Sequence, residues 1–429
     1  MSKFQIILTS VFGVLIVAAV LSFSFYRGNS STEASVSVWG SLPAEAWNNI
    51  IHNTLAAEQD ISISYTEKNK DTIVEQFTEA LAEGRAPDLI LISQEDLWML
   101  KAKLMPISYK SISERTFRDT FAEGAEIFLL PEGIMALPLS IDPLVLYYNR
   151  DSLSSAGIAK PLAYWDEMYA AAGKLTKRDA AGNITQSVMA LGEAVNIPNA
   201  KEILSLLFMQ AGTAITELGG PERNEFKSVL AANPGLTTAP ADSALEFYTQ
   251  FANPAKVYYS WNKTLDPAQT HFAAGESTYY AGFASELPVL LRKSPTINLG
   301  AARMPQSRIN HKTITFGKMY GLAISRGTGS PTVALVVARR LIRNDVAKAF
   351  SELSGLPPAR RDLLSDRPAE PMLSLFYDAA LQSRGWLDPA PRETRSIFAD
   401  AVGAVTSGKL RTSGAVNAAS RELESLIRN

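Results

Sequence analysis

The fold is decided by residues 136–149, which read Ala-Leu-Pro-Leu-Ser-Ile-Asp-Pro-Leu-Val-Leu-Tyr-Tyr-Asn. Pro138 and Pro143 forbid a continuous helix here, and neither can donate the N–H bond of a central strand. A proline also pushes the residue before it toward extended geometry. We therefore expect the chain to pass straight through a crossing region and to resume as a buried strand at residues 144–148. Two lobes should meet at this crossing.

One carboxylate, that of Asp142, stands inside this apolar stretch. A lone carboxylate in such a passage must be hydrogen-bonded, solvated or functional. Two roles stay open for Asp142: it could cap a turn before Pro143, or it could contact a bound ligand.

Length and composition exclude several classes of protein. A chain of 429 residues exceeds one ordinary hydrophobic core, so we expect two or more domains. Its net charge is −2 and its Lys and Arg residues are scattered, which gives no electrostatic case for nucleic acid. The absence of cysteine excludes disulfides, thiol catalysis, thiolate metal sites and a lipid-modified N-terminal Cys.

The N-terminus contains an uncharged apolar segment from Phe4 to Tyr26, with Lys3 before it and Arg27 after it. As a helix it would span about 34 Å, enough to cross the hydrocarbon core of a membrane. A cleaved signal peptide is the competing interpretation and would give a secreted protein. We favour an uncleaved anchor at residues 1–27, because the segment is long for a signal peptide and ends without a small-x-small cleavage site. The very short N-terminal flank then places the body on the extracytoplasmic side.

After a polar linker at residues 28–33, strand and helix patterns alternate. The expected elements are a strand at 35–39, a helix at 43–58, a strand at 61–65, a helix at 73–81 and a buried strand at 88–92. This order implies a parallel sheet with right-handed crossovers, whose ligands bind beyond the carboxyl ends of the strands. Trp39, at the end of the first strand, is placed to face a ligand, although a core position explains it equally well.

Beyond residue 149 the pattern becomes more helical. It predicts helices at 165–175, 203–212, 243–251 and 332–343, a hairpin turn at 179–183, and short strands at 298–304, 314–316 and 321–325. The tail reads as two helices, at residues 396–405 and 414–427.

Catalytic motifs are missing from the sequence. His52, His271 and His311 are isolated from one another, without the spacing of a zinc site. There is no Gly-x-Ser-x-Gly elbow and no phosphate loop. Carboxylate pairs such as Glu95 with Asp96 are expected on solvated faces. We therefore expect no catalytic residue, no cofactor and no metal.

Aromatic and polar side chains near predicted turns remain as candidates for ligand binding. Aromatic faces stack on sugar rings, while Asp and Asn side chains bind hydroxyl groups through directional hydrogen bonds. The candidates are Trp39, Asp142, Asn196, Tyr280, Phe283, Tyr320 and Trp386. Taken singly, each aromatic or amide fits packing at least as well. Trp386 comes first among the aromatics, because Gly385 and Pro389 place it in a loop.

Six separated stretches are informative as an ordered set rather than singly. They are Gly84-Arg-Ala-Pro-Asp88, residues 137–149 with Trp165-Asp-Glu167, Phe272-Ala-Ala-Gly275, residues 316–324, Gly355-Leu-Pro-Pro358, and Ser383-Arg-Gly-Trp386. In this order the chain resembles the extracellular solute-binding proteins of ABC importers, the group that includes maltose-binding protein and related sugar receptors. The chain departs from the family's pattern in two respects. It has no lipidated Cys, and its segment Glu276-Ser-Thr-Tyr-Tyr280 lacks the small residue and Met that usually follow the glycine in the family.

The resemblance implies an α/β periplasmic-binding-protein-like fold, two-lobed with a hinge and an interlobe cleft, here preceded by the N-terminal transmembrane helix. Lobe 1 would take residues 33–138 plus 321–365, and lobe 2 would take residues 139–320 plus 366–429. It also implies a monomer that captures a small solute without chemistry, for which a carbohydrate is our best interpretation. The solute would pass to the transmembrane subunits of an ABC permease.

Other functions stay open at this stage. The same scaffold could bind a peptide, a polyamine or an anion, or could serve as a surface sensor. A membrane-tethered glycan-active enzyme is a further alternative, since two distant carboxylates can meet in the fold.

Overall fold

The computed structural model describes residues 34–55, 60–219, 225–308 and 312–428. Within these ranges, no helix is both long enough and apolar enough to cross a membrane. The expected anchor at residues 1–27 and the linker at residues 28–33 lie outside the described residues.

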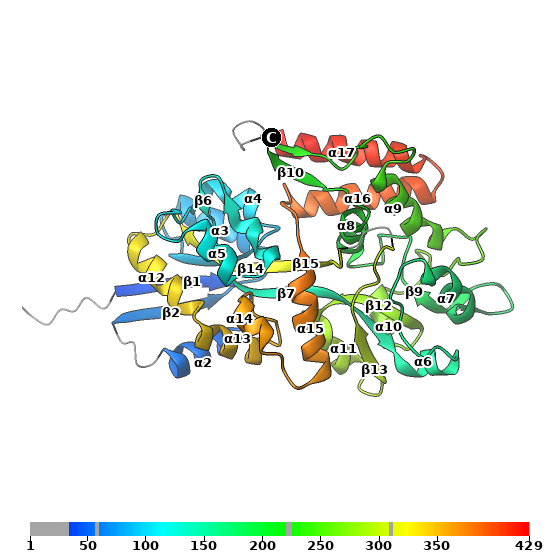
Figure 1. Cartoon of the computed structure of the whole chain (residues 1–429), viewed down its shortest axis with the longest axis horizontal. Helices are drawn as coiled ribbons and strands as arrows, with labels where there is room; N and C mark the ends of the chain where they lie inside the picture. Colours follow the sequence, from blue (N-terminus) through cyan, green and yellow to red (C-terminus); the bar gives the residue numbers. More distant parts are fainter. Residues whose placement is uncertain (1–33, 56–59, 220–224, 309–311, 429) are drawn as a thin grey trace, which may run out of the picture.

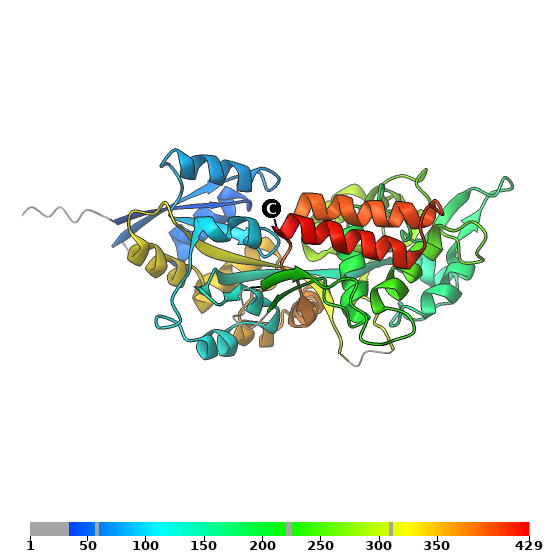
Figure 2. The same cartoon turned by 90° about the horizontal axis from the view of Figure 1, so that it is seen from above.

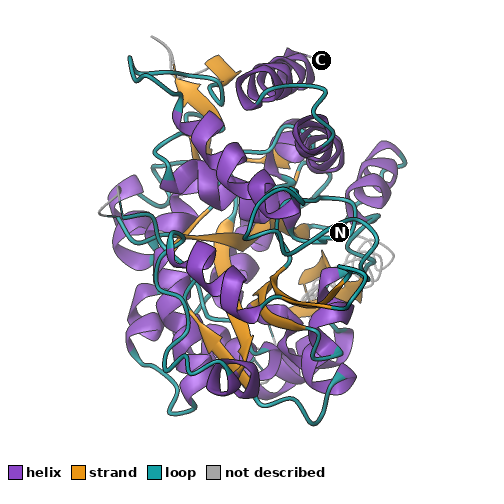
Figure 3. Ribbon diagram, turned by 90° about the vertical axis from the view of Figure 1, so that its right-hand side faces the viewer, coloured by secondary structure: helices purple, strands orange, loops and turns teal. Residues whose placement is uncertain are grey.

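Two hydrophobic cores divide the molecule along its long axis (Figure 1). Core 1 contains Phe77, Leu91 and Phe350, and its elements lie on the left of the view. Core 2 contains Trp165 and Leu204, and its elements lie on the right. Viewed along the long axis, helices lie on both sides of the strands (Figure 3).

The core 1 side begins with the predicted β-α-β-α-β alternation. Its strands are β1 (Ala34–Gly40), β2 (Ile61–Glu67), β3 (Leu89–Ser93), β4 (Leu104–Met105), β5 (Leu129–Leu130) and β6 (Gly133–Ile134). Its helices are α2 (Ala44–Thr54), α3 (Ile73–Ala82), α4 (Leu97–Leu100), η1 (Lys101–Lys103), α5 (Glu114–Thr120), η2 (Glu123–Phe128), α12 (Pro331–Leu341), α13 (Asn344–Ser354) and α14 (Arg361–Ser365). β1 pairs in parallel with β2 and with β3, as the alternation predicts.

The core 2 side is more helical. Its strands are β8 (Lys177–Arg178), β9 (Ile184–Met189), β10 (Thr216–Gly219), β11 (Glu225–Ser228), β12 (Ser277–Phe283) and β13 (Leu299–Ala302). Its helices are α6 (Arg150–Ser155), α7 (Glu167–Leu175), α8 (Ala200–Gln210), α9 (Pro240–Thr249), η3 (Gln250–Ala252), α10 (Ala268–Ala273), η4 (Ala284–Glu286), α11 (Leu287–Lys293), α16 (Pro391–Thr406) and α17 (Thr412–Arg428). α16 and α17 pack side by side, as Figures 1 and 2 show.

Two long strands, β7 (Leu137–Asn149) and β14 (Thr315–Ser325), join the two sides through the middle of the molecule (Figure 2). They are antiparallel neighbours within one 11-stranded sheet. β7 changes core between Ile141 and Leu144, and β14 changes core between Phe316 and Met319. Pro371–Gln382 (α15) lies at the same junction, with Phe376 in core 2 and Tyr377 in core 1, and is followed by β15 (Ser383–Arg384).

The expectation that a strand resumes only at residue 144 is wrong, because β7 is continuous through both prolines. Pro143 lies opposite Gly317, and Pro138 lies opposite Gly321, where the register of β14 shifts. A glycine partner has no side chain to crowd the proline ring, and the irregular register at Pro138 already interrupts the regular hydrogen-bond ladder there. Prolines can therefore stand in this central strand.

The separate short strands expected at residues 314–316 and 321–325 form the single strand β14. The polar residue Lys318 interrupts the apolar pattern between them and makes the sequence read as a break. In the fold the Lys318 ammonium group lies 3.0 Å from a carboxylate oxygen of Glu95. The carboxylate compensates the buried positive charge, so the strand can continue through Lys318.

Candidate functional site

The turn after β3 places a carboxylate between the two sides of the molecule. β3 is buried along its whole length, and Gln94 follows it directly. The Gln94 side chain accepts a hydrogen bond from Met319 N at 2.6 Å, and Gln94 N donates to Met319 O at 3.0 Å. This clamp fixes the next residue, Glu95, at the carboxyl end of β3. Ligands of parallel sheets bind at such ends.

The first turn of α8 supplies two charges from the core 2 side. Lys201 and Glu202 have side chains only 1% exposed, and they are the charged residues of a helix that is otherwise uncharged and mostly buried. Asn199 precedes the helix and donates to Ala281 O at 3.1 Å and to Glu286 Oε1 at 2.8 Å. These bonds tie the start of α8 to the end of β12.

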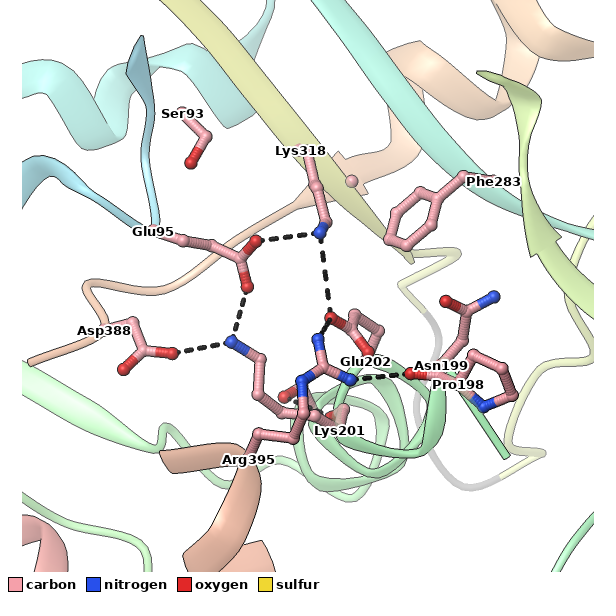
Figure 4. Close-up of polar contacts among 12 residues, drawn as sticks. Ser93, Glu95, Pro198, Asn199, Lys201, Glu202, Phe283, Lys318, Asp388 and Arg395 are labelled. Carbon is pink, nitrogen blue, oxygen red and sulfur yellow. Dashed lines mark hydrogen bonds and ion pairs between the residues drawn. The ribbon is translucent and has the colours of Figure 1, made fainter. Parts of the chain in front are cut away.

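Six ionisable side chains meet at this place, and we call them the charge cluster (Figure 4). They are Glu95, Lys201, Glu202, Lys318, Asp388 and Arg395. They come from the turn after β3, from α8, from β14, from the loop before α16 and from α16 itself. Residues that lie far apart in the sequence therefore converge beside the crossing strands.

The ion pairs of the charge cluster are short, except for the one between Lys318 and Glu202. Lys201 Nζ lies 2.6 Å from Glu95 Oε1 and 2.8 Å from Asp388 Oδ2. Lys318 Nζ lies 3.0 Å from Glu95 Oε2 and 3.8 Å from Glu202 Oε1. Arg395 Nη2 lies 3.1 Å from the same Glu202 oxygen. The other oxygen, Glu202 Oε2, is buried and has no hydrogen-bond partner among the described residues.

The cluster favours the charged forms of Glu95, Lys201 and Lys318 despite their burial, whereas burial outweighs Lys201 at Asp388 and raises the pKa of that carboxyl. Burial disfavours the carboxylate of Glu95, but the ammonium groups of Lys201 and Lys318 outweigh burial and hold the pKa of Glu95 below its usual value. Burial likewise disfavours the charged forms of Lys201 and Lys318, but the surrounding carboxylates raise the pKa of both lysines. Three carboxylates face three cations, so the cluster is balanced in charge.

Asp142, one of the predicted site residues, lies in β7 directly opposite Lys318. It is 2% exposed, and its Oδ1 accepts a hydrogen bond from Ser285 N at 3.0 Å. The capping of a turn before Pro143 is therefore wrong, because Asp142 sits within a strand and binds a residue 143 positions away. Burial raises the pKa of Asp142 to about 6, although the bonds from Ser285 lower it.

Phe283, Tyr320 and Trp386 lie near the charge cluster. Lys318 Nζ is 4.9 Å from the centre of the Phe283 ring, and Tyr320 follows Lys318 by two residues in β14. Trp386 lies in a loop, as predicted, but it is only 7% exposed. Its indole N–H donates to Ser205 Oγ at 3.1 Å, and Lys201 Nζ is 5.9 Å from its ring.

The contacts of three other predicted site residues lie outside the charge cluster. Trp39 is half-buried at the end of β1, with Lys68 Nζ 3.9 Å from its ring centre. The Asn196 amide donates to Asn262 O at 3.0 Å and to Leu265 O at 2.9 Å, and thus braces a loop. The Tyr280 ring lies in core 2, and its hydroxyl donates to Glu286 Oε2 at 2.5 Å.

Sequence reasoning missed most of the charge cluster. The expectation that Glu95 lies on a solvated face is wrong, because the residue is 8% exposed and paired with two lysines. A usable signal was present: Lys201 and Glu202 are the charged residues of a largely apolar helix, and Lys318 is the charged residue of a largely apolar strand. The sequence could not show that these charges meet. The described ranges contain no group of three or more His, Asp or Glu side chains arranged to hold a metal ion.

A family model described as bacterial extracellular solute-binding protein matches residues 51–371. The chain belongs to this family. Its members bind solutes for ABC transporters and are not enzymes, so the protein is an extracellular or periplasmic solute-binding protein. No curated protein matches the sequence.

Solved structures show the same fold at low sequence identity. A cyclo/maltodextrin-binding protein complexed with maltotetraose has a TM-score of 0.74 and 16% identity, over 94% of this chain and 98% of that one. The cyclic alpha-maltosyl-1,6-maltose binding protein from Arthrobacter globiformis has a TM-score of 0.74 and 14% identity, over 92% and 99%. An ABC transporter solute-binding protein from Thermotoga lettingae, bound with alpha-D-tagatose, has a TM-score of 0.66 and 20% identity, over 92% and 100%. The chain therefore has the α/β periplasmic-binding-protein-like fold that the sequence predicts.

Proposed function

We propose that this solute-binding protein captures a small carbohydrate beside the charge cluster and delivers it to an ABC permease. The two cores would be the centres of two lobes, with residues 33–138 plus 321–365 in lobe 1 and residues 139–320 plus 366–429 in lobe 2. A solute that touches both lobes binds their closed arrangement better and shifts the population toward it. Residues 1–27 would anchor the monomer to the outer face of the membrane.

The charge balance of the cluster is the observation that carries the proposal. Its carboxylates accept hydrogen bonds from hydroxyl groups, and its ammonium and guanidinium groups donate to hydroxyl oxygens. A neutral polyhydroxylated solute can satisfy both kinds of group. The cations of the cluster would repel a polyamine and its carboxylates would repel an anion, so a balanced cluster offers neither a net attraction. Saccharides named in the solved structures of similar fold support the same class of solute.

Four side chains would complete the binding surface. Glu202 Oε2, which is buried without a partner in the described residues, would accept a hydroxyl. Phe283 would offer its ring face beside Lys318, while Asp142 and Tyr320 would line the crossing strands. The expected ligand contacts of four other residues remain predictions: Trp39, Asn196, Tyr280 and Trp386. The contacts described above explain each of these side chains as part of the packing of the protein.

A thermal-shift screen of the full chain tests the proposal. The protein is kept in a detergent without a sugar headgroup, such as an alkyl polyoxyethylene ether, so that the detergent cannot occupy the site. The panel contains monosaccharides, malto- and manno-oligosaccharides, peptides, polyamines and phosphate. A ligand at 100 times its dissociation constant adds about 2.7 kcal/mol to the free energy of unfolding.

We expect a saccharide to raise the unfolding midpoint, and Glu202→Gln to reduce that rise without removing the fold. Glu422→Gln serves as the matched control, because Glu422 is an exposed carboxylate on α17. Shifts with peptides, polyamines or phosphate alone would refute the carbohydrate. An equal loss of binding in both variants would refute the assigned site.

A further inference from the structure

The carboxylate of Glu286, at the end of η4, accepts four hydrogen bonds. Its Oε1 accepts from Asn199 Nδ2 at 2.8 Å and from Phe283 N at 2.9 Å. Its Oε2 accepts from Gln269 Nε2 at 2.7 Å and from the Tyr280 hydroxyl at 2.5 Å. A carboxylate has about four acceptor positions. Glu286 therefore has no acceptor position left for a solute.

The four donors come from three separate elements. Asn199 precedes α8, Gln269 lies at the beginning of α10, and Tyr280 and Phe283 belong to β12. All four donors are neutral, and a hydrogen bond to an ionised acceptor is about twice as strong as one between neutral groups. One carboxylate therefore ties the end of β12 to the beginnings of two helices.

The bond from Phe283 N closes a turn of the chain that contains Ser285. Ser285 N donates to Asp142 Oδ1 at 3.0 Å, and the centre of the Phe283 ring is 4.9 Å from Lys318 Nζ. A shift of this turn would move both contacts. The bond to Glu286 therefore fixes the position of two groups that border the crossing strands.

The bond from Asn199 fixes the beginning of α8. Asn199 also donates to Ala281 O at 3.1 Å, so one amide attaches α8 to β12 and to Glu286. The first turn of α8 carries Lys201 and Glu202, and Asn199 lies beside the charge cluster (Figure 4). The direction in which this turn meets the cluster thus depends on the same carboxylate.

We infer that Glu286 is a positioning residue of the candidate site: it holds the turn at residues 283–285 and the beginning of α8 in the arrangement that faces the charge cluster. The inference rests on the proposed capture of a solute at this place. Groups that the protein already holds in their binding geometry lose less conformational freedom when a solute binds. Loss of the Glu286 bonds should therefore weaken solute binding, although Glu286 itself does not contact the solute.

Interchanging a carboxylate and an amide tests these bonds. Glu286→Gln keeps one acceptor oxygen but turns an NH₂ group toward the Gln269 amide, which also donates. The added substitution Gln269→Glu supplies a carboxylate that accepts from this NH₂ group. It also faces Lys293, whose Nζ lies 2.8 Å from Gln269 Oε1. Glu370→Gln is the matched control, because Glu370 likewise accepts from a backbone N–H three residues on, that of Leu373, but at the start of α15.

Two measurements are made on the full chain in the detergent named above. Isothermal titration calorimetry gives the dissociation constant of the saccharide that produces the largest shift in the thermal screen. Hydrogen–deuterium exchange followed by mass spectrometry gives the protection of residues 281–287 in the absence of saccharide. The helix α9, whose buried residues belong to core 2, is the internal reference for the stability of that core.

We expect the dissociation constant to rise about tenfold in Glu286→Gln, and exchange at residues 281–287 to become about tenfold faster with α9 unchanged. The double variant with Gln269→Glu should recover most of both effects, and Glu370→Gln should show neither. Equal acceleration in α9 would indicate a purely structural role and overturn the inference. An unchanged dissociation constant in Glu286→Gln, or a double variant that recovers neither effect, would also overturn it.

The exchange measurement separates this inference from the proposed function. If no saccharide binds the parent protein, the proposed function fails. Faster exchange confined to residues 281–287 in Glu286→Gln would then still support the positioning of this turn by Glu286.

Discussion

The substitution Lys201→Met gives the sharpest test of the charge cluster. It keeps an unbranched side chain of similar length and removes one buried positive charge, which lies 2.6 Å from Glu95 and 2.8 Å from Asp388. Loss of one partner from a buried ion pair leaves an uncompensated charge and costs about 3–5 kcal/mol. We expect a loss in this range at pH 7, at the upper end because two carboxylates share the lysine.

The pH dependence of this loss has a definite sign. The pKa of Glu95 lies below its usual value in the folded protein, so its ion pairs stabilise the fold above the pKa of the unfolded chain, about 4.3. That contribution disappears as the pH falls through the lower, folded-state pKa. In Lys201→Met, protons can neutralise the carboxylates that have lost their lysine. The difference in the free energy of unfolding between the variant and the parent should therefore become smaller below about pH 4.

Urea unfolding followed by circular dichroism provides the assay, with the midpoint and slope fitted separately. Lys227→Met is the matched control, since Lys227 is 41% exposed and its carboxylate partner lies 4.0 Å away. Asp388→Asn should restore part of the stability when added to Lys201→Met, because it removes one of the stranded charges. A loss below about 1 kcal/mol for Lys201→Met, or equal losses in both lysine variants, would refute the assigned role of the buried charge.

Two further predictions concern the crossing strands. Burial raises the pKa of Asp142 to about 6, so the folded protein loses stability as the pH rises from about 4 to 6. The amide oxygen of Asp142→Asn can still accept the hydrogen bond from Ser285 N but does not ionise. In unfolding experiments over this pH range, the free energy of unfolding of the variant should therefore rise by up to about 3 kcal/mol relative to that of the parent. A constant difference between the two proteins would contradict this. Gly317→Ala should lower the free energy of unfolding by about 1–3 kcal/mol, because the new methyl group would lie 2.4 Å from Ser383 Oγ. Adding Ser383→Gly should recover much of this loss in thermal unfolding. No recovery would show that the clash is not the cause.

Local patterns predicted the β-α-β-α-β start and several later helices, but not elements such as β12, α13 and α15. The hairpin turn at residues 179–183 joins β8 to β9, and the two tail helices appear as α16 and α17. The sequence signals for a turn or a helix come from residues that are close together in the chain. Each of these elements could therefore be predicted from its own segment of sequence. The passage of residues 136–149 as extended chain follows from proline geometry alone. The interruption that the sequence suggested is absent, because β7 is continuous and pairs with glycines of β14 at both prolines.

The candidate site was predicted only in part. Asp142 could be singled out because a carboxylate inside an apolar run needs a partner, and the structure places it opposite Lys318. Glu95 could not, because its neighbour Asp96 makes the segment look like an ordinary solvated turn. Only the pairing of β3 with β14 and the packing of α8 show that the residue is buried.

The sequence by itself determined the α/β alternation, the extended crossing at Asp142 and the family, since all three depend on the order of residues along the chain. The tertiary structure decided which charges meet. Lys201 is separated from Glu95 by more than a hundred positions and from Asp388 by 187, and no local periodicity couples them. Burial makes each of these charges costly alone and tolerable together, and burial is a property of the assembled fold.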